Sequence, residues 1–188
     1  MTYFNLNKIF ENFEQNESVG YKGDLIEHVQ SLTNITNDAS NAERINRWMS
    51  AFDMFKEKPI MGFGPGTYQF QYGVFQTFEY MTRISTLQGD KGNAHSEFFN
   101  VLSELGIIGL LVLLATLYTV YISAHRLMFN SKHKEIRTIA IAVFLGLVTY
   151  FAHGVVNSFM DVEKAAILVF GSFAAIAALD LKNTAEVE

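Results

Sequence analysis

The sequence predicts an all-α membrane protein with about three transmembrane helices, preceded by an outer segment of helix and loop. The distribution of charge carries this prediction. Residues 1–97 contain eight Lys/Arg and twelve Asp/Glu, whereas residues 98–188 contain six and seven, confined to short islands between uncharged runs. Soluble cores rarely need three separate apolar stretches of membrane-like length. We therefore expect a membrane protein, and the lack of a signal peptide before the outer segment indicates a fragment of a larger polytopic bundle.

Three uncharged runs predict transmembrane helices at residues 103–124, 138–157 and 163–181. The run from Leu105 to Ala124 would be about 30 Å long as a helix, which matches the hydrocarbon thickness of a bilayer. The second run extends from Thr138 to Met160 and includes the polar His153 and Asn157. These two side chains either line a functional interior or form an interhelical hydrogen bond. The third run is roughly 22 Å long as a helix and must borrow flanking residues or thin the bilayer.

The loop between the first two predicted helices sets their orientation. It contains Arg126, Lys132, Lys134 and Arg137 against a single acid, Glu135. Lys/Arg enrichment in a short loop marks the cytoplasmic side. Residues 1–97 then lie outside and the tail 182–188 lies inside. Because residues 1–97 do not begin with a signal peptide, we expect upstream helices to deliver them across the membrane.

The outer segment is predicted to change character at residue 40. Residues 1–39 are polar and show no sustained period, whereas apolar residues recur at helical spacing from Ile45 to Phe55. Ser40 and Glu43 have the spacing of a capping box, so the helix is expected to begin at Ser40 and to stop near Pro59. Near a bilayer this amphipathic helix can lie at the interface with Trp48 at headgroup level.

A glycine-rich turn and an aromatic stretch complete the outer segment. GFGPG (residues 62–66) is not a Walker loop, because no GK[ST] follows. It is either a turn joining two helices or a place where an anion or another chain approaches the backbone closely. The Tyr and Phe residues between positions 67 and 87 are typical of core packing or of an aromatic membrane belt, with a sugar-stacking surface as the alternative.

Composition excludes several classes of function. There is no Cys, so neither a disulfide nor a thiolate metal site is possible. His28, His95 and His153 show no ligand-like spacing, and we predict no metal and no cofactor. The net charge of -5 gives no indication of nucleic-acid binding. The apolar runs indicate membrane lipid as the partner.

Two stretches resemble the O-antigen ligase-related membrane domain, which lipopolysaccharide O-antigen ligases share with many polysaccharide polymerases. ERINRWMSAFDMFKEKPIMGFGPGTYQFQY is similar to the family pattern of Arg, Trp, an amphipathic helix, Pro, G-x-G-x-G and an aromatic through Arg44, Trp48, Pro59, Gly62, Gly64, Gly66 and Tyr68. AHSEFFNVLSELGIIGLLVLL resembles H-[NS]-x-x-L…E-x-G-x-x-G through His95, Glu104, Gly106 and Gly109. Phe99 departs from the commoner Leu, and HGVVNSFMD (residues 153–161) resembles a later family segment.

The resemblance implies a glycosyltransferase at the periplasmic face of the bacterial inner membrane, with residues 1–97 periplasmic. Its donor would be an oligosaccharide linked to undecaprenyl diphosphate, and its acceptor a hydroxyl of a glycan or of a lipid A-core-like molecule. No cofactor is implied, because the diphosphate is already a good leaving group. The resemblance also implies further membrane helices N-terminal to this chain. Ligase and polymerase differ only in the acceptor, so both remain open.

The resemblance and the required chemistry together select His95 and Arg44 as catalytic residues. An imidazole with a pKa near 6.5 can take the proton of an acceptor hydroxyl or orient it. A guanidinium binds phosphate oxygens bidentately, and we expect Arg44 in the first turn of its helix, where backbone donors also favour anions. The predicted substrate-binding residues are Arg47, Arg83, Gly64, Gly66 and Tyr68. For the arginines, a solvated helix face is the alternative.

The remaining motif residues are predicted to be structural: Trp48, Pro59, Glu104, Gly106 and Gly109. Glu104 would lie about 13 Å from His95 on a continuous helix, so we expect it to cap or pair locally. Gly106 and Gly109 are expected to permit close helix packing. Two other functions compete with the enzyme: a truncated or accessory three-span protein without activity of its own, and a scaffold whose outer domain binds a partner protein.

Overall fold

The structure, a computed structural model, describes residues 39–81, 85 and 92–185, and the regular structure in these residues is helical throughout. In chain order the elements are α3 (Ala39–Glu57), α4 (Tyr68–Gln71), the 3-10 helices η1 (Tyr72–Phe75) and η2 (Phe78–Tyr80), α5 (Glu97–Asn130), α6 (Lys134–Gly154) and α7 (Glu163–Ala185). The predicted all-α class is confirmed. Apart from its last residue, the predicted polar segment 1–39 lies outside the described residues.

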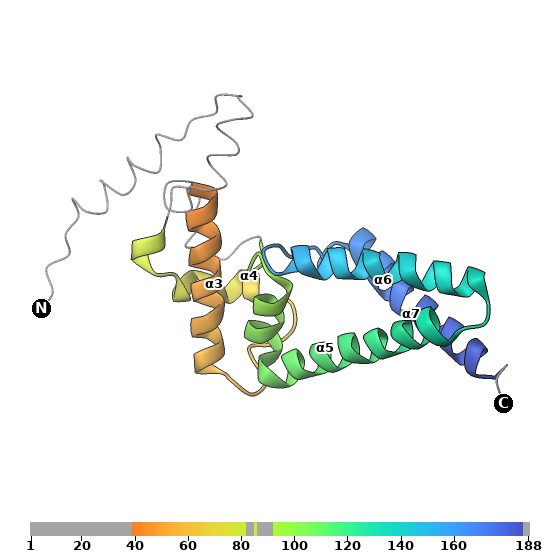
Figure 1. Cartoon of the computed structure of the whole chain (residues 1–188). Helices are drawn as coiled ribbons and strands as arrows, with labels where there is room; N and C mark the ends of the chain where they lie inside the picture. Colours follow the sequence, from red (N-terminus) through yellow and green to blue (C-terminus); the bar gives the residue numbers. More distant parts are fainter. Residues whose placement is uncertain (1–38, 82–84, 86–91, 186–188) are drawn as a thin grey trace, which may run out of the picture.

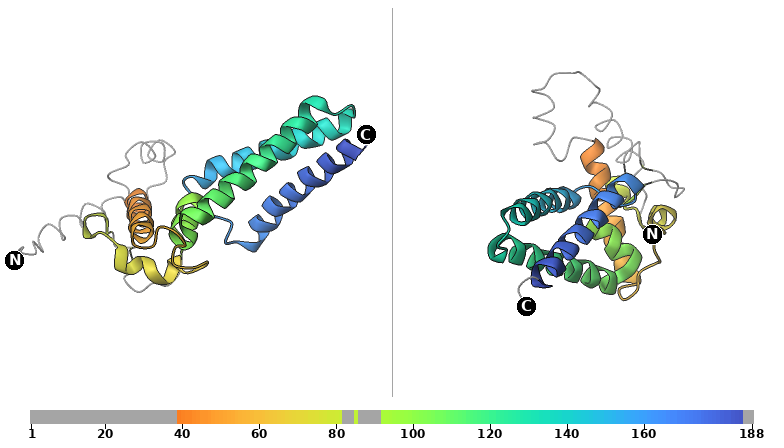
Figure 2. Two further views of the ribbon diagram at one scale, coloured as in Figure 1. Left: turned by 90° about the horizontal axis from the view of Figure 1, so that it is seen from below. Right: turned by 90° about the vertical axis from the view of Figure 1, so that its right-hand side faces the viewer.

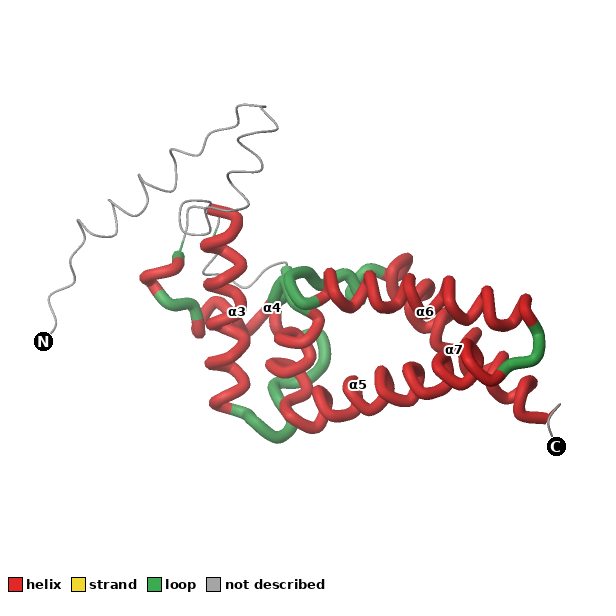
Figure 3. Tube along the Cα trace, in the orientation of Figure 1, coloured by secondary structure: helices red, strands yellow, loops and turns green. Residues whose placement is uncertain are grey.

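The described residues form two parts, which Figure 1 shows side by side. α5, α6 and α7 run alongside one another, and α3 lies across one end of them, with α4 beside it. The other views in Figure 2 show the same crosswise arrangement. In the tube of Figure 3, the connection between α6 and α7 lies at the end near α3, whereas the loop between α5 and α6 lies at the far end with the C-terminus.

The three long helices are the membrane part of the chain. Each is long and apolar enough to cross a bilayer. Large apolar side chains such as Leu111, Leu145 and Leu168 point outward and are exposed. Such surfaces are unfavourable in water but match the acyl chains of lipid. The chain is therefore a membrane protein with three candidate spanning helices among the residues described.

The helix ends differ from the predicted spans, because an uncharged run reports bilayer thickness and not where a helix starts or stops. α5 begins at Glu97 and ends at Asn130, so it is longer at both ends than the predicted 103–124. Ser96 caps its start, with the Ser96 Oγ accepting a hydrogen bond from the Phe99 N–H (3.4 Å). α6 ends earlier than predicted, at Gly154, and α7 continues to Ala185.

Each of the two parts has its own apolar core. In the outer part, Ala51 and Met54 of α3 pack with Tyr68, Tyr72 and Ala94. In the helical bundle, a first cluster joins all three helices through Ala124, Leu127, Ile136, Ala140 and Ile176, and a second through Leu147, Phe151 and Val169. At the far end, the Arg126 guanidinium of α5 pairs with the Asp180 carboxylate of α7 at 2.5 Å.

The start of α3 does not match the capping-box prediction. The described helix already includes Ala39, so Ser40 lies within it and is not the residue before it. The Glu43 carboxylate contacts the side chains of Arg47 and Ser85. The predicted end is confirmed, since α3 stops at Glu57, two residues before Pro59. Because Ser40 lies inside the helix, the predicted capping position was wrong.

Candidate functional site

α5 is broken at Gly106, and the turn that follows α3 fills the break. Gly106 has φ 65° and ψ -161°, which is not helical. The Ile107 and Ile108 N–H groups therefore donate to the Pro59 and Ile60 carbonyls (2.8 and 3.4 Å). On the other side of the break, the Gly64 N–H donates to the Glu104 carbonyl (2.8 Å). The backbone groups released by the break are thus paired with a segment forty or more residues earlier.

Glu104 fixes the glycine-rich turn through its side chain. Its two carboxylate oxygens accept hydrogen bonds from the Gly66 and Tyr68 N–H groups, both at 2.9 Å. The expectation that Glu104 caps or pairs locally is therefore wrong, because its partners lie 36 and 38 positions away in the sequence. A carboxylate that accepts two backbone donors is a strong, charge-assisted clamp. It orders the turn against the first part of α5.

The turn residues that were predicted to bind substrate use their polar groups in hydrogen bonds within the protein. The Gly66 N–H is held by Glu104, and Tyr68 is buried and stacked on Tyr72 with ring centroids 5.2 Å apart. The Tyr68 hydroxyl donates to the Arg47 carbonyl (2.9 Å). Burial raises the pKa of Tyr68, so it remains a neutral donor. These contacts favour structural roles for Gly66 and Tyr68 over the predicted binding roles, and no described contact assigns a ligand to Gly64.

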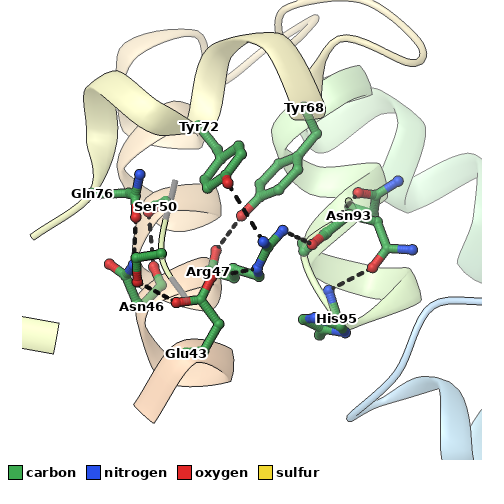
Figure 4. A network of polar contacts seen from close by, with 12 residues as sticks. Glu43, Asn46, Arg47, Ser50, Tyr68, Tyr72, Gln76, Asn93 and His95 are labelled. Carbon is green, nitrogen blue, oxygen red and sulfur yellow. Dashed lines mark hydrogen bonds and ion pairs between the residues drawn. The ribbon is translucent and has the colours of Figure 1, made fainter. Parts of the chain in front are cut away.

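Arg47 is the centre of a buried polar network, shown in Figure 4. Its Nε donates to the Glu43 carboxylate (2.8 Å) and its Nη1 to the Asn93 carbonyl (3.1 Å). Its guanidinium also lies over the Tyr72 ring, 4.8 Å from the centroid. Gly92 makes room for it, since a Cβ there would lie 2.5 Å from Nη1. With its donors engaged and its side chain buried, Arg47 is better placed to hold α3 to the segment before α5 than to bind phosphate.

His95 has its backbone held on both sides in an unusual conformation. Its φ is 49°, in the left-handed region that few residues other than glycine adopt. The His95 N–H donates to the Asn93 Oδ1 (3.0 Å), and its carbonyl accepts from the Trp48 Nε1 (3.1 Å). Trp48 also stacks on Phe99 at 6.0 Å, so it packs within the outer part as well as binding this carbonyl. Strained conformations of this kind persist where the surroundings impose them, and they cluster at functional sites.

The imidazole of His95 and the guanidinium of Arg44 are the two groups of this site with no hydrogen bond or ion pair to the described residues. Burial lowers the pKa of His95, and the positive charges of Arg47 and Arg44 lower it further. The ring is therefore neutral at pH 7 and able to accept a proton. Arg44 is half-buried on α3, one turn before Trp48. Since α3 already includes Ala39, Arg44 lies beyond the first turn, and the predicted help from helix-end donors is wrong.

The family model for O-antigen ligase matches residues 3–114, more than half of the chain. The chain belongs to the O-antigen ligase family. The match ends within α5, so it includes α3, the glycine-rich turn, His95 and the break at Gly106. No curated protein and no solved structure matches the chain significantly.

Two polar residues of this O-antigen ligase family chain were not singled out from the sequence. The Asn93 side chain accepts from the His95 N–H and donates to the Ser158 carbonyl (3.0 Å) and to Asp161 (3.2 Å). The buried Glu97 carboxylate accepts from the Tyr150 and Ser158 hydroxyls and from two backbone N–H groups, those of Phe159 and Met160, at 2.7–3.0 Å. The sequence did contain a signal for Glu97, because it is an acid close to the candidate catalytic His95 at the start of an apolar run. Both residues fasten the His95 segment to the loop between α6 and α7.

Two further residues named from the sequence are His153 and Arg83. His153 is exposed and bonds to Asn157 of the same chain segment, with Nε2 and Nδ2 3.0 Å apart. Among the described residues His153 therefore neither lines the interior of the three-helix bundle nor bonds to another long helix, and its two predicted roles stay predictions. Arg83 lies outside the described residues.

Proposed function

We propose that this chain carries the catalytic end of an O-antigen ligase- or polymerase-type glycosyltransferase. The donor is a glycan linked to undecaprenyl diphosphate, and the acceptor is a sugar hydroxyl of a second glycan or of a lipid A-core-like molecule. The family supports the class of reaction. The observation that carries the site assignment is His95, whose backbone is fixed in a left-handed conformation while its imidazole remains free within the described structure.

In the proposed step, the His95 imidazole takes the proton of the acceptor hydroxyl as its oxygen attacks the anomeric carbon of the donor sugar. A new glycosidic C–O bond forms, and the bond between that carbon and the diphosphate oxygen breaks. The electron pair leaves with the lipid diphosphate, whose growing negative charge the Arg44 guanidinium stabilises. The lowered pKa of His95 suits this role, because a neutral base is present at physiological pH.

The proposed location is the bacterial inner membrane with the site on its periplasmic face. The loop between α5 and α6 contains Lys132, is followed by Lys134 at the start of α6, and lies at the end of the bundle opposite α3 (Figure 1). Lys/Arg-rich short loops stay in the cytoplasm. This arrangement supports a periplasmic α3 and His95, on the side where a translocated lipid-linked glycan is displayed. The basic loop and the site are on opposite ends, as the proposal needs.

The test of the reaction is substitution at the chromosomal locus, with surface polysaccharide measured on gels. We expect His95→Ala to abolish the polysaccharide and Arg44→Ala to reduce it strongly, both at unchanged protein level. The matched control is His125→Ala, because His125 lies near the far end of α5 and is exposed. Long accumulated lipid-linked glycan would indicate a ligase, and single repeat units a polymerase. Normal polysaccharide in both site variants would remove these assignments and favour an accessory protein.

The orientation has a separate test, for which the absence of Cys is convenient. Single Cys substitutions at Val74 and at Lys132 can be labelled in intact cells with a membrane-impermeant maleimide, because both positions are exposed. We expect label at position 74 and none at position 132 until the membrane is opened. The reverse pattern would place His95 in the cytoplasm and overturn the proposal.

A further inference from the structure

The loop between α3 and the glycine-rich turn presents two large apolar side chains to its surroundings. Ile60 is 61% exposed and Met61 73% exposed. They lie outside the three long helices, in a part of the chain where Met54, Tyr68 and Tyr72 pack into a core. Phe70, Val74 and Phe78 of this part are also exposed. Isolated exposed apolar residues are common on proteins. This pair requires an explanation because of where the backbone places it.

The backbone ties this loop to the start of the membrane-crossing part of α5. The Pro59 carbonyl accepts from the Ile107 N–H and the Ile60 carbonyl from the Ile108 N–H. Ile107 and Ile108 are themselves exposed and lie in the uncharged run of α5. The side chains of Ile60 and Met61 thus extend an apolar surface that already belongs to a spanning helix. Their depth is set by hydrogen bonds, not by the loop's own flexibility.

An exposed lysine just before the apolar pair suits a lipid headgroup region, although the exposed Glu57 precedes it. Lys58 is exposed, its Nζ lies 4.3 Å from the centroid of the Phe63 ring, and no carboxylate within the described residues pairs with it. Lys56 is also exposed, although it pairs with Asp53 at 2.8 Å. Long Lys side chains at a bilayer boundary place their stems among apolar groups and their ammonium groups among phosphates. Aromatic rings beside them suit the same boundary.

We propose that residues 58–61 insert into the bilayer leaflet on the site side, with Ile60 and Met61 among the upper acyl chains and Lys58 at the phosphates of anionic phospholipid. The partner is the bilayer itself, because the apolar surface is continuous with α5. α3 lies across the long helices (Figures 1 and 2), so this anchor would hold α3 flat along the leaflet. Arg44 and the Trp48 contact to His95 would then remain just above the lipid. The proposal does not depend on the glycosyltransferase assignment.

Fluorescence quenching of the whole chain in vesicles of phosphatidylethanolamine and phosphatidylglycerol tests this insertion. A bimane label is placed at Met61→Cys or Ile60→Cys, with Val74→Cys on η1 as the matched control, since Val74 is 85% exposed and has no bond to α5. We expect lipids with a shallow doxyl group to quench positions 60 and 61 several-fold more than position 74. Aqueous iodide should show the opposite order. The emission of the single residue Trp48 checks that each variant is folded.

Two outcomes would overturn the proposal. Iodide quenching at position 61 equal to that at position 74 would place the loop in water. Protection of positions 60 and 61 from both quenchers would mean that protein covers them. The role of Lys58 is tested separately. Lys58→Glu should reduce the doxyl quenching of a label at position 61. The control Lys182→Glu, at the other end of the bundle, should leave this quenching unchanged. Equal quenching in the two charge variants would remove Lys58 from the proposal.

Discussion

Gly62 and Gly106 meet in an interlock that joins the turn after α3 to the break in α5. Both have φ 65°. A Cβ on Gly62 would lie 2.4 Å from the Glu104 carbonyl, and a Cβ on Gly106 would lie 2.4 Å from the Ile60 carbonyl oxygen. Backbone passes so close to backbone that neither position has room for a side chain. This contact sets how α3, which carries Arg44, meets the helix that follows His95.

Replacing Gly106 by Ala should destabilise the protein strongly. A left-handed residue with a side chain costs about 1–3 kcal/mol in backbone strain alone, and the overlap with Ile60 adds to it. We expect a clearly lower thermal midpoint for Gly106→Ala in detergent. The control is Gly146→Ala on α6, where an added Cβ meets no atom within 4 Å. That variant should unfold at or slightly above the original midpoint, and equal loss in both would contradict the interlock.

Replacing Glu104 by Gln should loosen the glycine-rich turn. The carboxylate serves the Gly66 and Tyr68 N–H groups with separate oxygens. An amide has a single acceptor oxygen, so one donor is left unpaired, at a cost of about 1–3 kcal/mol. We expect faster limited proteolysis between residues 62 and 68. Cleavage at the original rate would show that Glu104 does not hold the turn.

The fold was largely predictable because its signals are local. Uncharged runs predicted three long helices, and periodicity followed by Pro59 predicted the end of α3. The partners of Glu104 were not predictable, since nothing in its neighbourhood indicates two N–H groups 36 and 38 residues earlier. His95 and Arg44 came from the resemblance and stay predictions. For Arg47, residue type alone did not predict that its charge would lie against Glu43 in the interior.

The Glu43–Arg47 pair should be far more sensitive to single than to double substitution. Both side chains are buried, with 6% and 9% of their area exposed. Removing one partner leaves an uncompensated buried charge, at a cost of about 3–5 kcal/mol. We expect Arg47→Met to lower the unfolding midpoint more than Glu43→Leu combined with Arg47→Met. A double variant less stable than Arg47→Met alone would contradict the pairing.

Replacing Glu97 by Gln should detach the loop between α6 and α7 from the start of α5. Glu97 Oε1 accepts from the Tyr150 hydroxyl and from the Phe159 and Met160 N–H groups. An amide that keeps its oxygen at the Oε1 position loses the negative charge that these three donors share, and its NH2 group meets only the Ser158 hydroxyl. We expect several-fold faster hydrogen exchange at residues 159 and 160. Tyr150→Phe removes a single bond and should have a smaller effect, and unchanged exchange in Glu97→Gln would refute the clamp.

Removing the charge of Arg44 should raise the pKa of His95. Burial and the two nearby arginines lower this pKa from its ordinary value. In Arg44→Gln one of these charges is gone, so the imidazole protonates at a higher pH than in the original protein. The pH dependence of diethyl pyrocarbonate modification at His95, read by peptide mass spectrometry, reports the neutral form directly. Lys182→Gln, at the far end of α7, is the charge control and should not move the midpoint.

The same change in the pKa of His95 predicts the direction in which the pH dependence of activity moves. If neutral His95 is the base, activity is lost as the pH falls through its lowered pKa. The acidic limb of the residual activity in Arg44→Gln should then lie at higher pH than in the original protein, in step with the modification midpoint. An acidic limb that stays in place while the midpoint moves would separate the protonation of His95 from the reaction. His95 would then orient the acceptor without taking its proton.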